Sequence, residues 1–145
     1  MHKLHFTWEY VENLSKRLCG SLAGREFTRI AAVARGGLVP ACIVATQLGI
    51  RLVDTICIAA YQGTNRMNEG LALLKSVEGD GEGLLVVDDL TDTGSTAKAV
   101  RAFLPKAHFA CLCAKPQGTP YVDVFVTPVG QEEWIVFPWE EEGKC

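Results

Sequence analysis

The sequence predicts an α/β fold in which a mostly parallel central sheet is flanked by helices. Short apolar runs rich in β-branched residues alternate with segments whose apolar residues recur every three or four positions. The apolar runs are continuous, which is typical of parallel strands covered by helices on both faces. The chain has 145 residues, 48% of them hydrophobic, so we expect one packed domain over residues 1–145.

The first predicted element is an amphipathic helix that begins after Thr7. The Thr7 hydroxyl can cap this helix, and Glu9 lies in the first turn, where the helix dipole favours negative charge. Gly24 is a suitable stop. One apolar face follows from residues spaced three or four apart, namely Trp8, Val11, Leu14, Leu18 and Leu22.

The remaining elements continue the alternation of strands and helices. One helix carries Pro40 near its first turn and ends near Gly49, and another runs through Val100 and stops near Pro105. Residues 61–70 show no apolar periodicity and are expected to form a mobile loop, and a polar turn is expected at residues 78–83. Predicted strands cover residues 30–34, 53–60, 71–77, 84–87, 108–114, 122–127 and 134–137.

Charge, hydropathy and cysteine content disfavour several classes of protein. The chain has 14 Lys+Arg against 17 Asp+Glu, a formal net charge of −3, and lacks long basic runs, which disfavours a general nucleic-acid binder. No apolar run reaches the ~18 residues of a membrane-spanning helix, and the start of the sequence does not resemble an export signal. The six cysteines include no C-x-x-C pair and mostly lie in apolar contexts, which indicates buried, reduced thiols.

The segment from Val86 to Thr96 carries the strongest functional signal. Asp88 and Asp89 follow a buried strand, and ligands of open α/β sheets gather at the carboxyl ends of strands. A small, hydroxyl-rich loop then leads into a helix, whose backbone N–H groups can cradle a phosphate monoester, and Gly94 allows close approach. Carboxylates bind sugar hydroxyls and Mg²⁺, so the segment predicts a ribose 5-phosphate site with magnesium nearby.

Other interpretations of this region are available. An ordinary acidic strand-to-helix loop with Asp92 as a helix cap is the structural alternative. A P-loop is excluded because G-x-x-x-x-G-K-[ST] is absent. The glycines of residues 79–83 do not form G-x-G-x-x-G, and they precede a strand instead of following one.

The run from Val86 to Thr96 resembles the phosphoribosyl-pyrophosphate (PRPP) motif of the type I phosphoribosyltransferases. The resemblance extends from about Thr7 to Glu140 and implies the fold of that family. It also implies a flexible lid at about residues 61–70 and a small hood over the active site at about residues 128–140. Segments that narrow the resemblance to the xanthine-guanine branch of the family are residues 33–40, 48–51, 78–83, 105–109 and 114–116.

The resemblance implies a purine salvage enzyme. The family reaction transfers the 5-phosphoribosyl group of PRPP to N9 of a 6-oxopurine (guanine, xanthine or hypoxanthine) and releases pyrophosphate. Mg²⁺ is the implied cofactor, because negative charge builds on the leaving pyrophosphate. A hypoxanthine-guanine preference with poor use of xanthine, and a PRPP-sensing regulator on the same fold, are the alternatives.

The resemblance also assigns roles to the acidic segment. Asp88 and Asp89 are implied to hold the ribose hydroxyls and the metal, with Asp89 as the metal contact and Asp88 as a second candidate. Asp92 is implied to lie near purine N7 as the catalytic general acid/base. Ser95 stands where close relatives often carry Gly. The residues implied to bind PRPP and its phosphates are Arg35, Gly36, Gly37, Arg66, Asp88, Asp89, Leu90, Thr91, Asp92, Thr93, Gly94, Ser95 and Thr96.

Two arginines are candidates for pyrophosphate. Arg35 follows the first core strand, where a guanidinium can bind two pyrophosphate oxygens. The resemblance implies a non-proline cis peptide in this turn, expected between Arg35 and Gly36. Arg66 is the only cation in residues 61–70. Without the resemblance, Arg35 would be a surface residue of a glycine-rich turn and Arg66 a solvated loop residue.

The implied purine pocket consists of Asp92, Lys115, Trp134 and Ile135. An ammonium at Lys115 can donate to purine O6 and so select 6-oxopurines over adenine. Trp134 can stack on the base, and the carbonyls of Trp134 and Ile135 can accept hydrogen bonds from its edge. By themselves, Lys115 would be a solvated strand-end lysine and residues 134–137 a core strand.

The expected partners are PRPP and the purine bases, with no nucleic acid and no integral membrane association. The resemblance implies a homotetramer, with a homodimer as the alternative. The reduced thiols fit a cytoplasmic protein, and the resemblance adds peripheral attachment to the inner membrane as an option.

Overall fold

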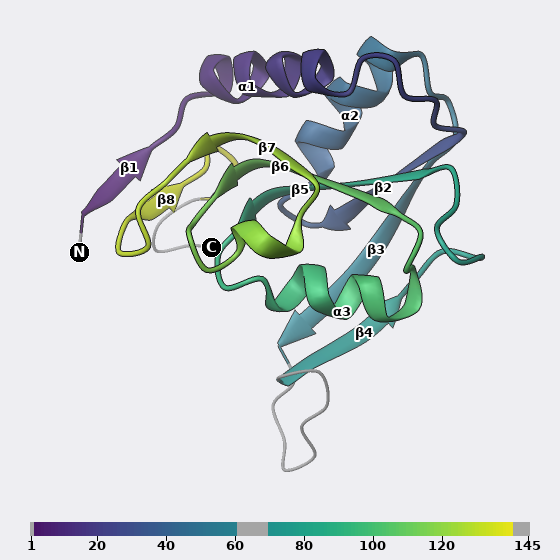
Figure 1. Ribbon diagram of the computed structural model, residues 1–145. Helices are drawn as coiled ribbons and strands as arrows, with labels where there is room; N and C mark the ends of the chain where they lie inside the picture. Colours follow the sequence, from purple (N-terminus) through teal and green to yellow (C-terminus); the bar gives the residue numbers. More distant parts are fainter. Residues whose placement is uncertain (1, 61–69, 141–145) are drawn as a thin grey trace.

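The computed structural model describes residues 2–60 and 70–140 as three layers, with a six-stranded sheet between helices (Figure 1). The strand order is β4-β3-β2-β5-β6-β7, and all pairs are parallel except the antiparallel β3–β4 pair. The predicted α/β class with a mostly parallel sheet is confirmed. The strands are β2 (Arg29–Ala34), β3 (Val53–Ala60), β4 (Leu71–Lys75), β5 (Leu84–Thr91), β6 (His108–Ala114) and β7 (Val124–Pro128).

Helices α1 (Trp8–Ser21) and α2 (Leu38–Leu48) cover one face of the sheet, and α3 (Ser95–Phe103) covers the other (Figure 1). Each face has its own buried cluster. The cluster beneath α1 and α2 includes Leu14, Val44, Leu85, Val87 and Leu112. The cluster beneath α3 includes Val86, Val100, Leu104 and Phe109. The alternation of β5 side chains between these clusters explains its continuous apolar sequence, because both faces of the strand are covered.

The first helix forms where its pattern predicts, with one exception. The Thr7 Oγ1 accepts a hydrogen bond from the Tyr10 N–H at 3.0 Å, so Thr7 is the cap. Leu14 and Leu18 are fully buried. Trp8 is 57% exposed, so its predicted place on the buried face is wrong. It lies in the first turn, and its ring centroid is 6.0 Å from that of Trp139.

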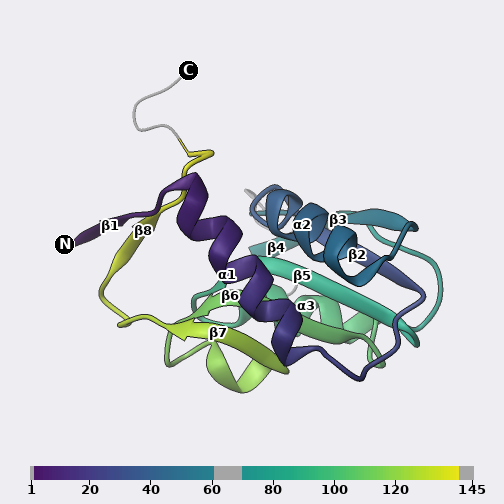
Figure 2. The same ribbon diagram turned by 90° about the horizontal axis from the view of Figure 1, so that it is seen from above.

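A second, two-stranded sheet stands off one end of the main sheet (Figure 2). It pairs β1 (Lys3–His5) in parallel with β8 (Trp134–Val136), and the Phe6 N–H donates to the Val136 carbonyl at 3.0 Å. Strand β1 was not predicted, because its short sequence has no strand periodicity and its partner lies at the other end of the chain. The strand β8 lies within the segment expected to form the hood.

Several boundaries differ from those predicted. Strand β5 continues to Thr91, four residues past the predicted end, because β6 keeps pairing with it as far as the Thr91–Ala114 pair. The acidic pair therefore lies inside the strand. Strand β7 begins at Val124, where its pairing with β6 begins, and Thr119–Tyr121 form a 3-10 helix. Residues 61–69 of the predicted lid, and with them Arg66, lie outside the described residues.

Across residues 2–60 and 70–140, no helix has the length and apolar character needed to cross a membrane.

Candidate active site

The carboxyl ends of β2 and β5 lie side by side at the centre of the sheet. These strands are neighbours, yet the chain leaves β2 toward β3 and leaves β5 toward β6, so the strand order reverses between them. Ligands of open α/β sheets bind at such a switch point. The two turns that border it begin at Arg35 and at Asp92.

The acidic pair lies on β5 beside this switch point. Asp88 is 8% exposed and Asp89 is partly buried, and the Asp88 Oδ1 accepts a hydrogen bond from the Asp89 N–H at 2.8 Å. Burial and then repulsion from Asp89 raise the pKa of Asp88 well above its usual range. Burial also raises the pKa of Asp89 to about 6, and the Glu140 carboxylate acts in the same direction.

These properties fit a divalent cation. Two adjacent carboxylates provide hard oxygen ligands, and a bound cation would oppose the burial and repulsion that raise both pKa values. Gly36 brings the turn after β2 against the same carboxylate, since a Cβ at Gly36 would overlap the Asp89 carboxyl group. Glycine therefore leaves the space that the Asp89 carboxyl group occupies.

A small cavity of about 110 Å³ opens where β5 leads into α3. Gly94 caps α3 in a left-handed conformation at φ 92°, and Ser95 is the first helical residue. A serine is therefore compatible with this position, because an L residue readily adopts a helical conformation. The Thr93 and Ser95 hydroxyls are 2.9 Å apart. The residues that line the cavity are Asp88, Leu90, Thr91, Asp92, Thr93, Gly94, Ser95, Thr96, Ala97 and Phe109.

The shape and polarity of this cavity suit a phosphate group. A helix N-terminus with a hydroxyl-rich loop offers N–H and O–H donors and a favourable dipole to an anion. The Tyr121 ring packs so closely on Gly94 that a Cβ there would collide with it. The alternative that Asp92 caps the helix is wrong. Gly94 occupies the cap position, and no side chain makes a capping hydrogen bond there.

Asp92 instead belongs to a cluster of side chains from three loops. Its Oδ2 lies 3.3 Å from the Lys115 Nζ, and its Oδ1 accepts a hydrogen bond from the Gln131 Nε2 at 2.8 Å. The Lys115 side chain is 6% exposed, whereas that of Asp92 is 52% exposed. The structure thus joins two residues predicted for the purine pocket, and the solvated-lysine alternative for Lys115 is wrong.

The turn after β2 approaches the acidic strand from the other side. Gly37 donates its N–H to the Val33 carbonyl at 2.8 Å, and a Cβ at Gly37 would collide with the Val87 carbonyl. Arg35 is exposed at the start of this turn. The cis peptide lies between Ala34 and Arg35, so its predicted position one bond later is wrong. No proline marks the turn, so nothing in the local sequence distinguishes one peptide bond from the next.

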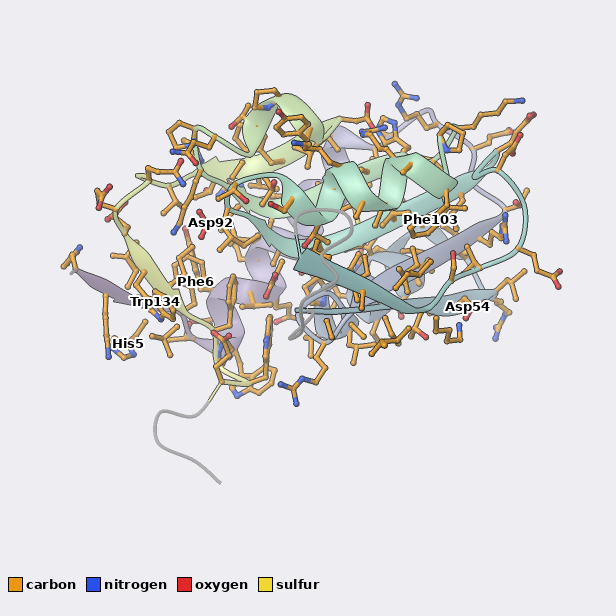
Figure 3. The ribbon with its side chains drawn as sticks, turned by 90° about the horizontal axis from the view of Figure 1, so that it is seen from below. His5, Phe6, Asp54, Asp92, Phe103 and Trp134 are labelled. Atoms are coloured by element: carbon orange, nitrogen blue, oxygen red, sulfur yellow. The ribbon has the colours of Figure 1, made fainter. Side chains whose placement is uncertain are left out.

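Strand β8 contributes an aromatic face. Trp134 is 53% exposed, while Ile135 is 6% exposed and belongs to the core beneath α1 and α2. Figure 3 shows Asp92 and Trp134 at the same end of the molecule and Asp54 at the far end. The alternative that this strand is entirely core holds for Ile135 but not for the Trp134 ring, which remains available to a flat ligand.

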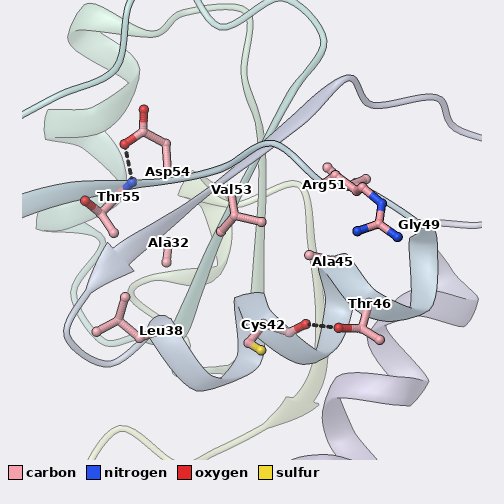
Figure 4. Close-up of a pocket in the computed structure, with 11 residues that line it drawn as sticks. Ala32, Leu38, Cys42, Ala45, Thr46, Gly49, Arg51, Val53, Asp54 and Thr55 are labelled. Atoms are coloured by element: carbon pink, nitrogen blue, oxygen red, sulfur yellow. Dashed lines mark hydrogen bonds between the residues drawn. The ribbon is translucent and has the colours of Figure 1, made fainter.

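A larger cavity of about 530 Å³ lies between α2 and β3, away from these groups (Figure 4). Apolar Leu38 and Val53 line it, and so do Cys42 and Asp54. Cys42 is exposed, so the expectation of buried thiols is wrong for this residue, although it holds for Cys19, Cys111 and Cys113. Asp88 and Asp92 line the smaller cavity and not this one, so the smaller cavity is the candidate active site.

No sequence pattern indicated that Gln131 and Tyr121 lie at the candidate site. Gln131 follows Gly130 in a turn between β7 and β8, and a lone polar residue in a turn has no distinctive signal. Tyr121 belongs to the 3-10 helix, and its ring receives the Lys98 ammonium at 5.2 Å from the ring centroid. Pairing of β5 with β6, and the turn between β7 and β8, bring these distant segments beside the loop.

Comparison with known proteins identifies the family of this chain. The phosphoribosyl transferase domain model matches residues 8–144. A xanthine-guanine phosphoribosyltransferase of Desulfotalea psychrophila is 48% identical over 139 residues, covering 95% of this chain and 86% of the relative. One from Nitratidesulfovibrio vulgaris is 50% identical over 137 residues, covering 94% of this chain and 83% of the relative. The crystal structure of a purine phosphoribosyltransferase from Pyrococcus horikoshii superimposes with a TM-score of 0.85 at 32% identity, covering 100% of this chain and 99% of that one. With this fold and these relatives, the chain belongs to the phosphoribosyltransferase family and has its type I fold.

Proposed function

We propose that this chain is a purine salvage enzyme that transfers the 5-phosphoribosyl group of PRPP to N9 of guanine, xanthine or hypoxanthine. The products are GMP, XMP or IMP and pyrophosphate. The observation that carries the proposal is the Asp92–Lys115 pair beside the cavity at the start of α3, with the acidic pair on the strand that leads into it. The names of the relatives from D. psychrophila and N. vulgaris agree with it.

The chain binds PRPP at the carboxyl ends of β2 and β5. The donors of residues 92–96 hold the 5′-phosphate, and Asp88 and Asp89 accept hydrogen bonds from the ribose hydroxyls. Arg35 and the Gly36 N–H bind the pyrophosphate, and Gly37, whose N–H donates to the Val33 carbonyl, holds the turn close to it. Asp89, with Asp88 as a second ligand, would hold Mg²⁺, which when bound neutralises charge on the pyrophosphate. Arg66, the nominated lid arginine, lies outside the described residues.

The purine lies against the Trp134 ring, with its O6 on the Lys115 ammonium and its N7 on Asp92. As the C1–oxygen bond of PRPP breaks, its electron pair leaves with pyrophosphate, and the N9 lone pair forms the new bond to C1. With the base in its N7-protonated form, attack by N9 makes the N7 proton acidic, and Asp92 accepts it. Lys115 disfavours a 6-amino group, because both groups would then present only hydrogen-bond donors to each other.

A spectrophotometric assay with PRPP, Mg²⁺ and each purine in turn tests this proposal. We expect nucleotide formation from all three 6-oxopurines and none from adenine. Turnover of guanine and hypoxanthine with little xanthine would favour the hypoxanthine-guanine alternative. Absence of turnover, together with PRPP-sensitive retention of RNA or DNA on a filter, would favour a regulator and overturn the proposal.

Replacing Asp89 by asparagine should stabilise the metal-free protein at neutral pH while abolishing its response to Mg²⁺. The folded-state pKa of Asp89 is about 6, above the ordinary 3.8, so the folded state binds the proton more tightly. Stability contributed by this group is therefore present below pH 3.8 and lost as the pH rises through about 6. Removing the charge should raise the free energy of unfolding by about 1–3 kcal/mol at pH 7.5.

Chemical denaturation with EDTA or with Mg²⁺ measures both effects. Asp54→Asn is the matched control, because the hydrogen bond from Lys75 lowers the pKa of Asp54, so its removal should give no such gain. Equal stabilisation of the wild type and of Asp89→Asn by Mg²⁺ would contradict the assignment of Asp89 as the metal contact.

We also propose that the enzyme is a cytoplasmic homotetramer. Exposed apolar residues support an assembly. Leu38 and Val53 line the α2–β3 cavity (Figure 4). They are 43% and 48% exposed, and Leu52 is 61% exposed. The five free cysteines of the described chain support a reducing location. Peripheral attachment to a membrane has no supporting feature in residues 2–60 and 70–140.

Light scattering should give about four times the chain mass of 15.8 kDa. We expect Val53→Lys to reduce that mass, because it places a charge in the apolar surface. A wild-type mass of twice the chain would favour the homodimer, and a monomeric wild type would contradict an assembly.

A further inference from the structure

Both polar atoms of the Gln131 side-chain amide make hydrogen bonds. Its Nε2 donates to the Asp92 Oδ1 at 2.8 Å and lies 3.5 Å from the Asp92 backbone carbonyl. Its Oε1 accepts from the Gln117 backbone N–H at 2.9 Å. A backbone N–H can only donate, so the amide oxygen must face Gln117 and the NH₂ group must face Asp92. The orientation of this amide is thereby determined by its partners.

The two oxygens of the Asp92 carboxylate have different partners. Gln131 takes Oδ1, and the Lys115 ammonium lies beside Oδ2 at 3.3 Å. Asp92 sits on a loop with its side chain 52% exposed, so packing does not restrain the carboxylate. The neutral Gln131 amide restrains it through hydrogen bonding and leaves the negative charge in place.

We propose that Gln131 is a positioning residue, which holds Asp92 by Oδ1 so that Oδ2 faces purine N7. This inference rests on the proposed function of Asp92 and Lys115. When a 6-oxopurine enters, its O6 competes for the Lys115 ammonium, and Oδ2 loses that partner. Gln131 keeps its bond to Oδ1, so the carboxylate stays aligned while the proton moves from N7 to Oδ2.

The same side chain also ties two loops together, and substitutions can separate this role from the first. Gln131→Glu keeps an oxygen that accepts from the Gln117 N–H, but it replaces the donor facing Asp92 with a second negative charge. Gln131→Met retains the approximate size and loses both bonds. Gln117→Met is the control, because the exposed Gln117 contributes its backbone N–H to the cluster, and every residue type except proline retains that group.

Steady-state kinetics with guanine and PRPP, together with thermal unfolding, test the proposal. We expect Gln131→Glu to lower kcat by about 10²-fold and Gln131→Met by about tenfold, with KM for PRPP changed less than about threefold. Gln117→Met should match the wild type. Thermal midpoints of both Gln131 variants should stay close to that of the wild type.

A wild-type kcat in Gln131→Glu would overturn the inference, because the hydrogen bond from Gln117 would then be enough for full turnover. Equal losses of kcat in both Gln131 variants, accompanied by lowered thermal midpoints, would also overturn the inference, because they would indicate a structural role. If Gln131→Glu does not fold, a wild-type kcat in Gln131→Met overturns it and a tenfold loss supports it. A wild type that turns over no purine contradicts the proposed function itself, whereas an active wild type with impaired Asp92→Asn and unimpaired Gln131→Glu contradicts this inference alone.

Discussion

Asp92→Asn is expected to lower kcat by about 10²–10⁴-fold while leaving KM for PRPP nearly unchanged. Asparagine has almost the same shape as aspartate, and its oxygen can still accept the hydrogen bond from Gln131. It cannot take the N7 proton as N9 attacks C1. The expected loss therefore falls on the chemical step, and PRPP binding through the acidic pair and the helix terminus is retained.

The measurement is steady-state turnover with guanine, accompanied by direct binding of PRPP. Asp80→Asn is a suitable control, since Asp80 lies in the turn before β5, where it pairs with Lys106 at 3.2 Å. Unchanged kcat in Asp92→Asn would remove Asp92 as the general acid/base. An equal loss of PRPP affinity would instead assign Asp92 to binding the sugar phosphate.

Lys115→Met is expected to weaken guanine binding by about 10- to 10³-fold, which corresponds to about 1.5–4 kcal/mol. The Lys115 side chain is 6% exposed, so an O6 bound to its ammonium would meet little competition from water. Methionine preserves much of the apolar stem and removes the charge. The remaining Asp92 carboxylate is 52% exposed and keeps its bond to Gln131, so the variant should fold.

Competition between guanine and adenine measures the selectivity that Lys115 confers. The variant should lose discrimination against adenine along with its affinity for guanine. Lys106→Met is the control, because the Lys106 side chain is 58% exposed and pairs with surface carboxylates. Unaltered guanine affinity in Lys115→Met would show that O6 is bound elsewhere.

Much of the fold follows from local features of the sequence. The apolar spacing of α1, the hydroxyl of Thr7 and the left-handed Gly49 at the end of α2 are read within one or two turns of chain. The strand before Asp88 is similarly evident, because a buried parallel strand needs a continuous apolar run. The acidic pair and the loop that leads into α3 were also predictable, because residues contiguous in the sequence form them.

What the sequence determined by itself was therefore the order of the elements and the chemistry of the 88–96 segment. The tertiary structure decided the pairing of β1 with β8, the exposure of Trp8, the peptide bond that is cis and the contact of Gln131 with Asp92. Periodicity and turn chemistry act over a few residues, whereas these features join segments that become neighbours only when the sheet assembles. Gln131 lies in a turn, and only folding brings its Nε2 to 2.8 Å from the Asp92 Oδ1.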